Sequence, residues 1–600
     1  QLLDAERGAQ GCSSGYTIAT AGPDIAALWN LRKKGVGLLG NAKGERRPVP
    51  FVEDTAVPPE HLADYIAEFR ALLDRRGLRY GMFGHVDVGC LHVRPALDMK
   101  EASDEQLLRG ISDEVVALTK KYGGVLWGEH GRGYRSEYTP TFFGPELYEE
   151  LRAVKSVFDP HNQLNPGKLA TPSKSTDRLV SLDATKRGSF DRQIHSQVRE
   201  KFAESVHCNG NGACFDYNPD AVMCPSSKVT KERIHSPKGR AGILREWLRL
   251  MSQEGHMAGA DNIPAEQALV RGRSSDPGDF SHQVYDAMNG CLACKACATQ
   301  CPIKVDIPHM RSAFYEQYHS RYRRPIKDYF VAGIEGMIRW FALGPRLFNF
   351  LMQLIVVKWV VARVVGIVDS PDLAVHTLRR GLKERGAERF EYQRLAALDD
   401  QEKARTVLLV QDMFTSYYEP NVVLAAYDLL TRLGLRVILL PYRENGKALH
   451  IKGFLRRFAR VVERNTGYLE GLAQLGIPLV GVEPATTLTY RDEYRHQLDR
   501  ALGFKVQLLQ EYLSEQLAAR TGPVIERRKT YRLFGHCTER TFEPKSQQLW
   551  QTVFSQLGAE LKLETTGCCG MCGVFGHEAE HLAESRGIFE MSWKPKLPQG

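Results

Sequence analysis

Ten of the thirteen cysteines fall in three short clusters, and these are the residues of the sequence most suited to chemistry. The clusters are Cys208, Cys214 and Cys224; Cys291, Cys294, Cys297 and Cys301; and Cys568, Cys569 and Cys572. Disulfide frameworks spread cysteines through small secreted domains, whereas clusters in a long chain are typical of metal binding in a reducing compartment. The sequence therefore predicts thiolate-held metal centres in a cytoplasmic protein.

The middle cluster has the spacing of a ferredoxin loop. From Cys291 to Pro302 the chain follows C-x2-C-x2-C-x3-C-P, in which three thiolates on one tight loop bind three irons of a [4Fe-4S] cluster. The cysteine before the proline turns toward a second cluster. Zinc is the alternative, but zinc sites usually pair two C-x2-C knuckles. The spacing favours iron and sulfur over zinc.

The first cluster contains the partner thiols of this loop. By two-cluster logic, Cys224 completes the cluster held by the first three cysteines of the middle run. Cys208, Cys214 and Cys301 then need a fourth ligand, for which His207 is a candidate. The alternative is that no second cluster forms. One [4Fe-4S] cluster is predicted, and a second is left open.

The last cluster places three thiols within five residues, and Cys537 is a more distant fourth. Such a group is an unusual choice for passive core packing. A metal or iron–sulfur site held by Cys537, Cys568, Cys569 and Cys572 is favoured over a redox disulfide.

A second kind of site is indicated by His85, His92 and the pair Glu129–His130. Residues seven apart point to opposite faces of a straight strand, so the chain must bend at residues 87–89 if both imidazoles are to converge. Two histidines and a carboxylate suit a divalent metal such as Zn or Mn with open positions. That metal would hold a 2-hydroxy carboxylate while His130 removes the hydroxyl proton. Two core histidines beside an unrelated surface pair are the alternative.

The charge balance is mildly basic, with a formal net charge of +9. It permits an acidic substrate or a membrane-surface contact, and it is far from a nucleic-acid-binding signature. Arg32, on a predicted short helix, could bind a substrate carboxylate through its planar fork, although an ordinary surface arginine is the alternative. The apolar stretch 347–368 is interrupted by Lys358 and Arg363, so it lacks the roughly 18 uncharged residues of a spanning helix. We expect a buried or interfacial helix there, with peripheral attachment at the inner membrane face left open.

The helices and strands that must position these residues indicate a multidomain protein with α+β and α/β domains. A length of 600 residues suggests three to five domains. The predicted segments are a substrate and metal domain at 1–170, a linker at 171–195, an iron–sulfur domain at 196–320, a helical connector at 321–400 and an α/β domain at 401–600.

Local patterns predict several elements within these segments. Apolar spacing predicts a helix over residues 62–73, and a capping-box pattern predicts a second helix that begins at Ser103. An apolar run predicts a strand at 125–127. In the last segment a strand, a helix and a strand lead from Asp412 to Glu444-Asn445-Gly446, and the same order leads from Cys537 to Cys568-Cys569-Gly570. We interpret these as two copies of one half-domain, of which only the second retains thiols.

With these residues in hand, the chain resembles the C-terminal part of a YdiJ-type FAD/iron–sulfur oxidoreductase, in the D-2-hydroxyglutarate dehydrogenase family that is related to D-lactate and glycolate dehydrogenases. Residues 1–170 resemble the substrate-side domain of the FAD-linked oxidase fold. Residues 200–310 resemble a ferredoxin-like segment, and residues 405–580 resemble the cysteine-rich CCG domain. Complete CCG domains usually carry two cysteine sets, of which the first is absent here.

The resemblance implies roles for individual residues. It implies metal ligation by His85, His92 and Glu129, acid–base catalysis by His130, carboxylate binding by Arg32 and flavin contact by Asn165. One departure is that Cys90 stands where relatives commonly have an asparagine before Leu91-His92.

The implied function is oxidation of a D-2-hydroxyacid, with D-2-hydroxyglutarate preferred and D-lactate second. Hydride would pass to FAD, and electrons would leave singly through the cluster to a quinone or an electron-transfer protein rather than to NAD or oxygen. The pyrophosphate-binding half of the flavin fold is missing, so we expect upstream sequence to hold most of the FAD. The alternatives are a D-lactate or glycolate dehydrogenase and a non-catalytic electron-transfer subunit, and a homo-oligomer is left open.

Overall fold

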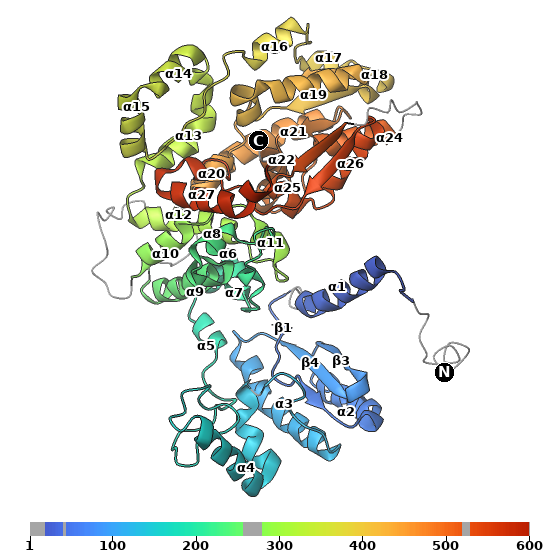
Figure 1. Cartoon of the computed structure of the whole chain (residues 1–600), viewed down its shortest axis with the longest axis vertical. Helices are drawn as coiled ribbons and strands as arrows, with labels where there is room; N and C mark the ends of the chain where they lie inside the picture. Colours follow the sequence, from blue (N-terminus) through green and yellow to red (C-terminus); the bar gives the residue numbers. More distant parts are fainter. Residues whose placement is uncertain (1–17, 40–43, 132, 256–278, 519–528, 599–600) are drawn as a thin grey trace. The chain divides into compact units, whose positions relative to one another are not determined.

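The computed structural model describes residues 18–39, 44–131, 133–255, 279–518 and 529–598, and the chain divides into two compact units, residues 1–194 and 195–600 (Figure 1).

The N-terminal unit is a small antiparallel sheet packed against helices. Its helices are α1 (Gly22–Leu39), α2 (Leu62–Asp74), α3 (Ala102–Lys121), α4 (Thr139–Phe158) and α5 (Arg187–Asp191), and its strands are β1 (Arg47–Pro48), β2 (Thr55–Ala56), β3 (Tyr80–His85) and β4 (Cys90–Leu97). Strand β4 pairs antiparallel with each of the other three. The helix predicted from residue 62 is confirmed.

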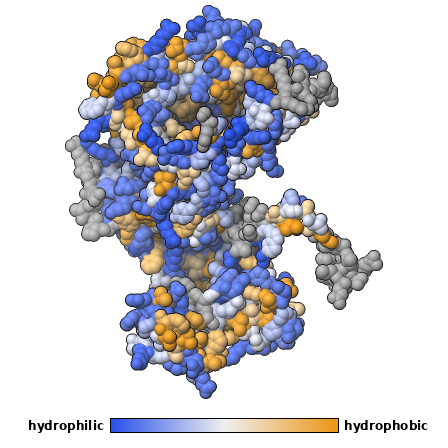
Figure 2. Space-filling view, viewed as in Figure 1, coloured by the Kyte–Doolittle hydropathy of each residue, from blue (hydrophilic) through white to orange (hydrophobic). Residues whose placement is uncertain are grey.

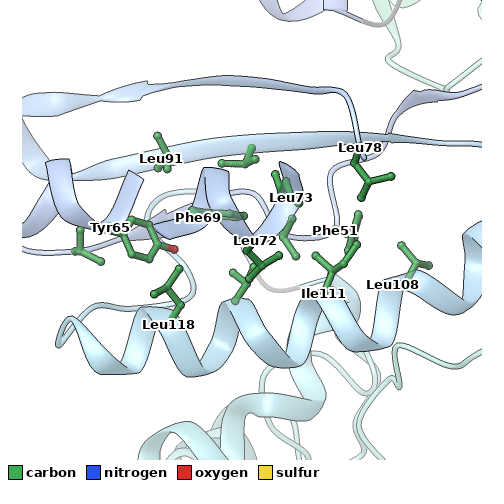
Figure 3. Close-up of a cluster of buried hydrophobic side chains, with 14 of the residues drawn as sticks. Phe51, Tyr65, Phe69, Leu72, Leu73, Leu78, Leu91, Leu108, Ile111 and Leu118 are labelled. Atoms are coloured by element: carbon green, nitrogen blue, oxygen red, sulfur yellow. The ribbon is translucent and has the colours of Figure 1, made fainter. Parts of the chain in front are cut away.

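The core of this unit lies between the sheet and helices α2 and α3 (Figure 3). Helix α2 buries Tyr65, Phe69 and Leu73, and helix α3 buries Ile111 and Leu118 against them. These positions follow helical spacing, which places one apolar stripe of each helix toward the core. The packing fixes β4, the strand that carries His92.

The second predicted helix is present as α3, but its predicted capping box and the predicted strand at 125–127 are wrong. Helix α3 begins at Ala102, and its N-cap, Glu101, makes no side-chain cap bond, so Ser103 forms no capping box. Residues 125–127 contribute only an isolated bridge from Val125 to Ala56, because β2 ends there after two residues and offers no longer partner.

The C-terminal unit begins with short helices around the cysteine clusters. These elements are α6 (Ser196–Lys201), α7 (Ala203–His207), α8 (Pro225–Thr230), α9 (Pro237–Gln253), α10 (Ser281–Asn289), α11 (Ala296–Gln300), α12 (Ile307–Arg321), α13 (Ile326–Phe341), α14 (Pro345–Gln353), α15 (Ile355–Val360), α16 (Leu378–Glu384), α17 (Tyr392–Ala396) and α18 (Asp400–Ala404). Among the described residues no single helix is long and apolar enough to cross a membrane, and only α14 with residues 355–365 passes as a pair, bent by 77°.

The rest of this unit contains two parallel sheets. The first has the order β6-β5-β7-β8, and the second pairs β9 with β10. The strands are β5 (Thr406–Val410), β6 (Arg436–Leu439), β7 (Leu479–Gly481), β8 (Val506–Leu508), β9 (Thr530–Phe534) and β10 (Glu560–Glu564). The helices are α19 (Pro420–Arg432), α20 (Lys447–Ile451), α21 (Leu455–Ala473), α22 (Pro484–Arg491), α23 (Glu493–Leu498), α24 (Leu509–Ala518), α25 (Cys537–Phe542), α26 (Ser546–Gln556) and α27 (Leu582–Ser592).

Both faces of the larger sheet are covered by helices. Leu408 of β5 packs with α21 on one face, while Val407 and Leu409 pack with α19 and α24 on the other. A strand buried on both faces is apolar throughout, as β5 is. Both predicted copies are strand, helix and parallel strand, but they lie in separate sheets.

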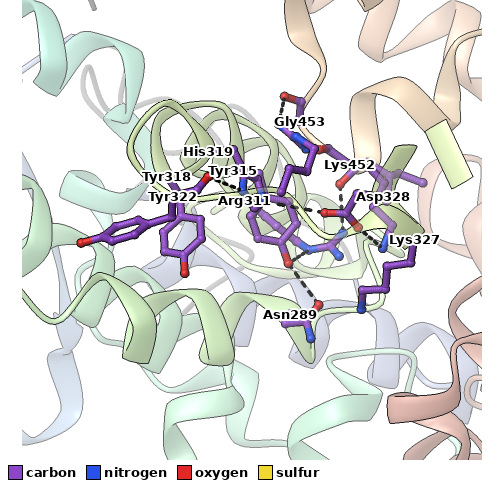
Figure 4. Close-up of polar contacts among 12 residues, drawn as sticks. Asn289, Arg311, Tyr315, Tyr318, His319, Tyr322, Lys327, Asp328, Lys452 and Gly453 are labelled. Atoms are coloured by element: carbon purple, nitrogen blue, oxygen red, sulfur yellow. Dashed lines mark hydrogen bonds and ion pairs between the residues drawn. The ribbon is translucent and has the colours of Figure 1, made fainter. Parts of the chain in front are cut away.

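A buried network of charges ties α12 and α13 to the parallel-sheet region (Figure 4). Lys452 Nζ lies 3.1 Å from Asp328 Oδ1 and 2.8 Å from Glu578 Oε1, and both partners are buried. Arg324 donates to the carbonyl oxygens of Lys452 and Gly453. Because an unpaired charge here would be costly, the network fixes the helical region against the sheet.

Candidate functional site

The turn between β3 and β4 brings His85 and His92 to one carboxylate. A 3-10 turn at Val86–Val88 and Gly89 at φ 67° bend the chain, which confirms the bend predicted from the spacing. His85 Nε2 lies 3.1 Å from Glu129 Oε1, and His92 Nε2 lies 2.9 Å from the same oxygen. The two imidazoles therefore share one oxygen atom as their neighbour.

His130 completes the group. Its Nε2 lies 3.4 Å from Glu129 Oε1, its ring stacks on that of His92 at 4.8 Å, and half of its side chain is exposed. The structure thus brings together the four residues His85, His92, Glu129 and His130 that the sequence singled out.

The loop that carries Glu129 and His130 is held by Asp54, whose role sequence reasoning missed. Asp54 is fully buried, and its two carboxylate oxygens accept from the backbone N–H groups of Glu129 at 2.8 Å and His130 at 2.9 Å. The Gly128 N–H donates to the Asp54 carbonyl at 2.9 Å. A buried carboxylate that binds two N–H groups fixes a loop strongly, and no spacing in the sequence predicts such a long-range contact.

The protonation states of the group suit metal binding. Burial lowers the pKa of His92, and the neighbouring His130 lowers it further. Partial burial opposes ionisation of Glu129, but the hydrogen bond from His85 and the charges of the three imidazoles lower its pKa overall. Neutral imidazole and ionised carboxylate are the forms that bind a divalent cation. His92 Nδ1 is buried and has no hydrogen-bond partner in the described chain.

Cys90 and Asp54 lie beside this donor set. Ligand atoms of Asp54, Cys90, His92 and Glu129 lie within 4.8 Å of one another. Burial, together with the charges of Asp54 and Glu129, raises the pKa of Cys90 to about 11. Cys90 is therefore a neutral thiol that donates toward Asp54 at 3.7 Å. His85 is not among these four mutually close donors, and metal ligation by His85, His92 and Glu129 stays a prediction.

The two other predicted residues of this unit differ in their position relative to the histidines. Arg32, exposed on α1, places Nη2 3.2 Å from His85 Nδ1, so it borders the group. Asn165 lies exposed after α4 with φ 50°. Within the described ranges, no hydrogen bond or ring contact joins Asn165 to the histidines, and its role toward flavin stays a prediction.

In the C-terminal unit, four cysteines surround one small cavity. They are Cys224, Cys291, Cys294 and Cys297, the set expected for the first [4Fe-4S] cluster. Cys224 and Lys295 have left-handed backbone angles, which turn the two loops inward. Arg240, almost fully buried, lies 3.7 Å from Cys224 Sγ through Nη1 and binds the Ala287 carbonyl at 2.6 Å.

The electrostatics of this cavity fit a metal cluster. Burial, then the negative charge of neighbouring groups, raises the pKa of Cys294 and of Cys297. Without iron these thiols are protonated, whereas iron binds thiolates and displaces their protons. The Arg240 cation lines the same cavity and offsets thiolate charge.

The remaining thiols of the first and middle clusters do not line this cavity. Cys208 and Cys214 are buried, and Cys301 is half-buried at the end of α11. A signal overlooked in the sequence is that residues 208, 211 and 214 repeat the spacing of 291, 294 and 297, with Asn211 in the middle position. Asn211 is exposed, and its Oδ1 accepts from the Ala213 N–H at 2.9 Å.

The third cysteine cluster is brought together with Cys537. The single thiol proton of Cys568 is shared between hydrogen bonds to Cys537 and Cys569, and this sharing lowers the pKa of each of these two thiols to about 6. The same hydrogen bonds, with burial, raise the pKa of Cys568. Cys572 and Cys294 pack against one small apolar cluster, so the two cysteine sites adjoin. The fold thus gathers these thiols in one region, and a metal or iron–sulfur site held by Cys537, Cys568, Cys569 and Cys572 stays a prediction.

Known proteins match this chain in two ways. Residues 1–169 match the C-terminal domain of FAD-linked oxidases, and residues 204–305 match a 4Fe-4S dicluster domain. The D-2-hydroxyglutarate dehydrogenases of Pantoea ananatis and Escherichia coli are 50% and 49% identical over 98% and 96% of this chain. A D-lactate dehydrogenase of Archaeoglobus fulgidus is 35% identical over 21% of the chain and 28% of its own length.

The chain spans 59% and 58% of the lengths of the two D-2-hydroxyglutarate dehydrogenases. The resemblance predicted from the sequence is confirmed: the chain joins a C-terminal domain of the FAD-linked oxidase type to a 4Fe-4S dicluster domain, and it is similar over nearly its whole length to D-2-hydroxyglutarate dehydrogenases.

Proposed function

We propose that this chain forms part of a FAD-dependent dehydrogenase that oxidises a D-2-hydroxyacid to the 2-oxoacid. The observation that carries the proposal is the convergence of His85 Nε2 and His92 Nε2 on Glu129, with His130 stacked on His92. D-2-hydroxyglutarate is the preferred substrate, because the relatives that match nearly the whole chain bear that name. D-lactate is second, supported by a shorter match.

His85, His92 and Glu129 are the residues that would hold a divalent metal such as Zn or Mn. Such a metal would polarise the substrate's hydroxyl and carboxylate oxygens, and FAD would accept the hydride from C2. Arg32 borders the group and would orient a carboxylate through its planar fork. His130, half-exposed beside the donors, takes the hydroxyl proton at an imidazole nitrogen. Asp54 positions His130 by binding its backbone N–H.

Electron release fits the C-terminal unit. Cys224, Cys291, Cys294 and Cys297 would hold a [4Fe-4S] cluster, which supplies one-electron transfer. The acceptor is external, either a quinone or an electron-transfer protein. A peripheral contact at the inner membrane face belongs to the same proposal.

Replacement of His130 tests the proposal. We expect His130→Asn to slow anaerobic bleaching of the flavin by D-2-hydroxyglutarate by about 10²–10⁴-fold, the usual contribution of a general base, while iron content is unchanged. His161→Asn, at an exposed histidine of the same unit outside the site, is the control. If His130→Asn bleaches at the normal rate, or if neither D-2-hydroxyglutarate nor D-lactate bleaches flavin in the unaltered protein loaded with FAD, the proposal is wrong.

A further inference from the structure

A cavity of about 100 Å³ lies at the carboxyl ends of the larger parallel sheet. Residues that follow three of its strands line it: Asp412–Phe414 after β5, Tyr442–Lys447 after β6 and Ala485–Thr486 after β7. In open parallel sheets, ligands bind outside the carboxyl ends of the strands. The position of the cavity therefore indicates a binding site, and the residues proposed for hydroxyacid oxidation do not line it.

The cavity adjoins both cysteine sites. Ala293 and Lys295, on either side of Cys294, line it together with Cys572. Cys294 and Cys572 also pack against the same apolar cluster. A molecule in this cavity would lie beside the residues that bind the proposed electron carrier.

The interpretation of this region as two copies of one half-domain explains why the copy that contains Asp412 has a cavity where the other copy has thiols. Asp412 corresponds to Cys537, and Glu444-Asn445-Gly446 corresponds to Cys568-Cys569-Gly570. The second copy therefore gathers thiols at the position where the first presents a carboxyl and an amide to a cavity. A half-domain that lacks thiolates has polar groups for an organic ligand instead.

The lining favours a ligand with an apolar ring. Most of its wall is apolar, and the apolar residues include Val331, Ile334, Met413, Phe414, Ile451 and Val574. Its lysines are already neutralised, because Lys295 pairs with Asp306, Asp492 and Glu493, and Lys447 pairs with Glu493. Arg443, the third cation of the wall, lies with its guanidinium 4.0 Å from the centre of the Tyr468 ring and has no ion pair among the described residues, so it can donate to an oxygen atom of a ligand.

Two polar groups could bind such a ring at its edge. Asn445 is 5% exposed, and within the described chain no group donates to its Oδ1. An unpaired buried amide oxygen costs free energy unless a ligand donor satisfies it. Asp412 is also buried, and burial together with the charge of Glu483 raises its pKa to about 6. Near neutral pH it can therefore give or accept a proton.

We propose that this cavity binds a quinone as the electron acceptor, an inference that rests on the proposed dehydrogenase function. The quinone takes up the two electrons that oxidation of the hydroxyacid releases and two protons, one through Asp412 and one from solvent, and becomes a quinol. The quinol hydroxyls then donate to Asn445 Oδ1 and Asp412. Helix α13, which contributes Val331 and Ile334 to the wall, leads directly to the exposed apolar surface of α14 and α15, a suitable approach for a lipid-soluble ligand.

Calorimetric titration of the oxidised full chain with menadione and with ubiquinone-1, under anaerobic conditions, tests the pocket without turnover. We expect saturable binding at one site. Ala485→Trp, which fills the cavity, should abolish it, and Asn445→Leu should weaken it about fivefold or more through loss of the Asn445 Nδ2 group, which can donate to a quinone carbonyl. Ala473→Trp, at a half-buried alanine of α21 outside the cavity, should bind as the unaltered chain does.

The outcome separates the pocket from the proposed function. Absence of binding of both quinones, or normal binding by Ala485→Trp and by Asn445→Leu, overturns the pocket. Reduction of ferricyanide by D-2-hydroxyglutarate tests the dehydrogenase without a quinone. If ferricyanide reduction fails while Ala485→Trp abolishes quinone binding, the function is wrong and the pocket stands. If ferricyanide is reduced and the Ala485→Trp variant binds quinone as the unaltered chain does, the pocket is wrong and the function stands.

Discussion

At the scale of single residues, one oxygen atom organises the proposed substrate site. Glu129 Oε1 has three imidazole nitrogens within 3.4 Å, and its position depends on the buried Asp54 carboxylate beneath the loop. An ionised Glu129 carboxylate beside a neutral His92 is suited to bind a cation. The same arrangement leaves His130 half-exposed, where it can meet a substrate.

Residue types and spacing were sufficient to predict His85, His92, Glu129 and His130 as one group, because these residues carry their own chemistry. They were insufficient for Asp54, whose part is to hold two backbone N–H groups of a loop 75 residues later. A carboxylate that binds backbone has no spacing signature in sequence, so its role emerges only when the chain is folded.

Asn211 provides a prediction at this scale. It stands in the middle position of a cysteine spacing that otherwise repeats Cys291, Cys294 and Cys297, so a second cluster would have three thiolates, from Cys208, Cys214 and Cys301. We expect the chain to hold fewer than the roughly eight irons of two complete [4Fe-4S] clusters. Asn211→Cys should raise the iron and sulfide content per chain and change the EPR spectrum.

The matched control is Asn209→Cys, at an exposed asparagine two residues away that lacks the repeat spacing. An unaltered chain that already contains about eight irons, or an equal gain of iron by Asn209→Cys, would contradict this prediction.

At the scale of elements, the β3–β4 turn decides whether the two histidines converge. Gly89 has φ 67°, and a Cβ atom built there would lie 1.8 Å from the Val57 carbonyl oxygen. We expect Gly89→Ala to destabilise the N-terminal unit by about 2–4 kcal/mol, because it adds a backbone clash to the cost of a left-handed conformation. Bound divalent metal should fall with it.

Urea unfolding and metal analysis check this expectation against Gly77→Ala. Gly77 has φ 62° but open space around its Cβ position, so it isolates the conformational cost of about 1 kcal/mol. Equal losses of stability in the two variants would show that the contact with Val57 is unimportant.

Helix α12 contains, close to its junction with α13, a buried histidine that makes the stability of the fold depend on pH. Burial of His319, aided by the charge of Arg324, lowers its pKa to about 4. The unfolded chain, with a pKa near 6.5, therefore binds the proton first as the pH falls. The stability that neutral His319 provides is complete above about pH 6.5 and is lost progressively toward pH 4.

We expect the free energy of unfolding of the C-terminal unit to decrease by about 2 kcal/mol between pH 7.5 and pH 5 through this residue. Denaturant titrations at both values should show a weaker dependence in His319→Gln. His376→Gln, at an exposed histidine of the same unit, should keep the full dependence. A pH dependence that is identical in all three proteins would exclude His319 as its source.

At the scale of the whole molecule, helix patterns and clustered cysteines predicted where chemistry occurs, but not how the sheets pair. The copy containing Asp412 and the copy containing Cys537 show similar sequence patterns, and nothing local to either indicates that they join different sheets. Strand order depends on contacts between distant segments. For the same reason, the cavity beside Cys572 and the burial of Lys295 follow only from the folded chain.

Helices α14 and α15 form an exposed apolar surface on the C-terminal unit (Figure 2). The exposed apolar side chains there include Leu343, Leu347, Phe350, Ile355, Val356 and Trp359. Residues 336–368 contain Arg339, Arg346, Lys358 and Arg363 and no acidic residue, and all four cations are exposed. Apolar side chains flanked by cations alone match a bilayer surface with anionic lipids, since each cation near such a surface contributes about 1 kcal/mol.

We therefore expect the full chain to sediment with vesicles of phosphatidylcholine and phosphatidylglycerol, and less with phosphatidylcholine alone or at high salt, because salt screens the cations. The double variant Ile355→Glu, Trp359→Glu should lose this binding, since each buried apolar side chain contributes about 1.5–3 kcal/mol. Val422→Glu, at an exposed valine on α19, should bind normally. The contrary outcome is that the unaltered chain fails to sediment with vesicles and is a dimer in light scattering, with the double variant a monomer. In that case the surface binds a second copy of the chain and not a membrane.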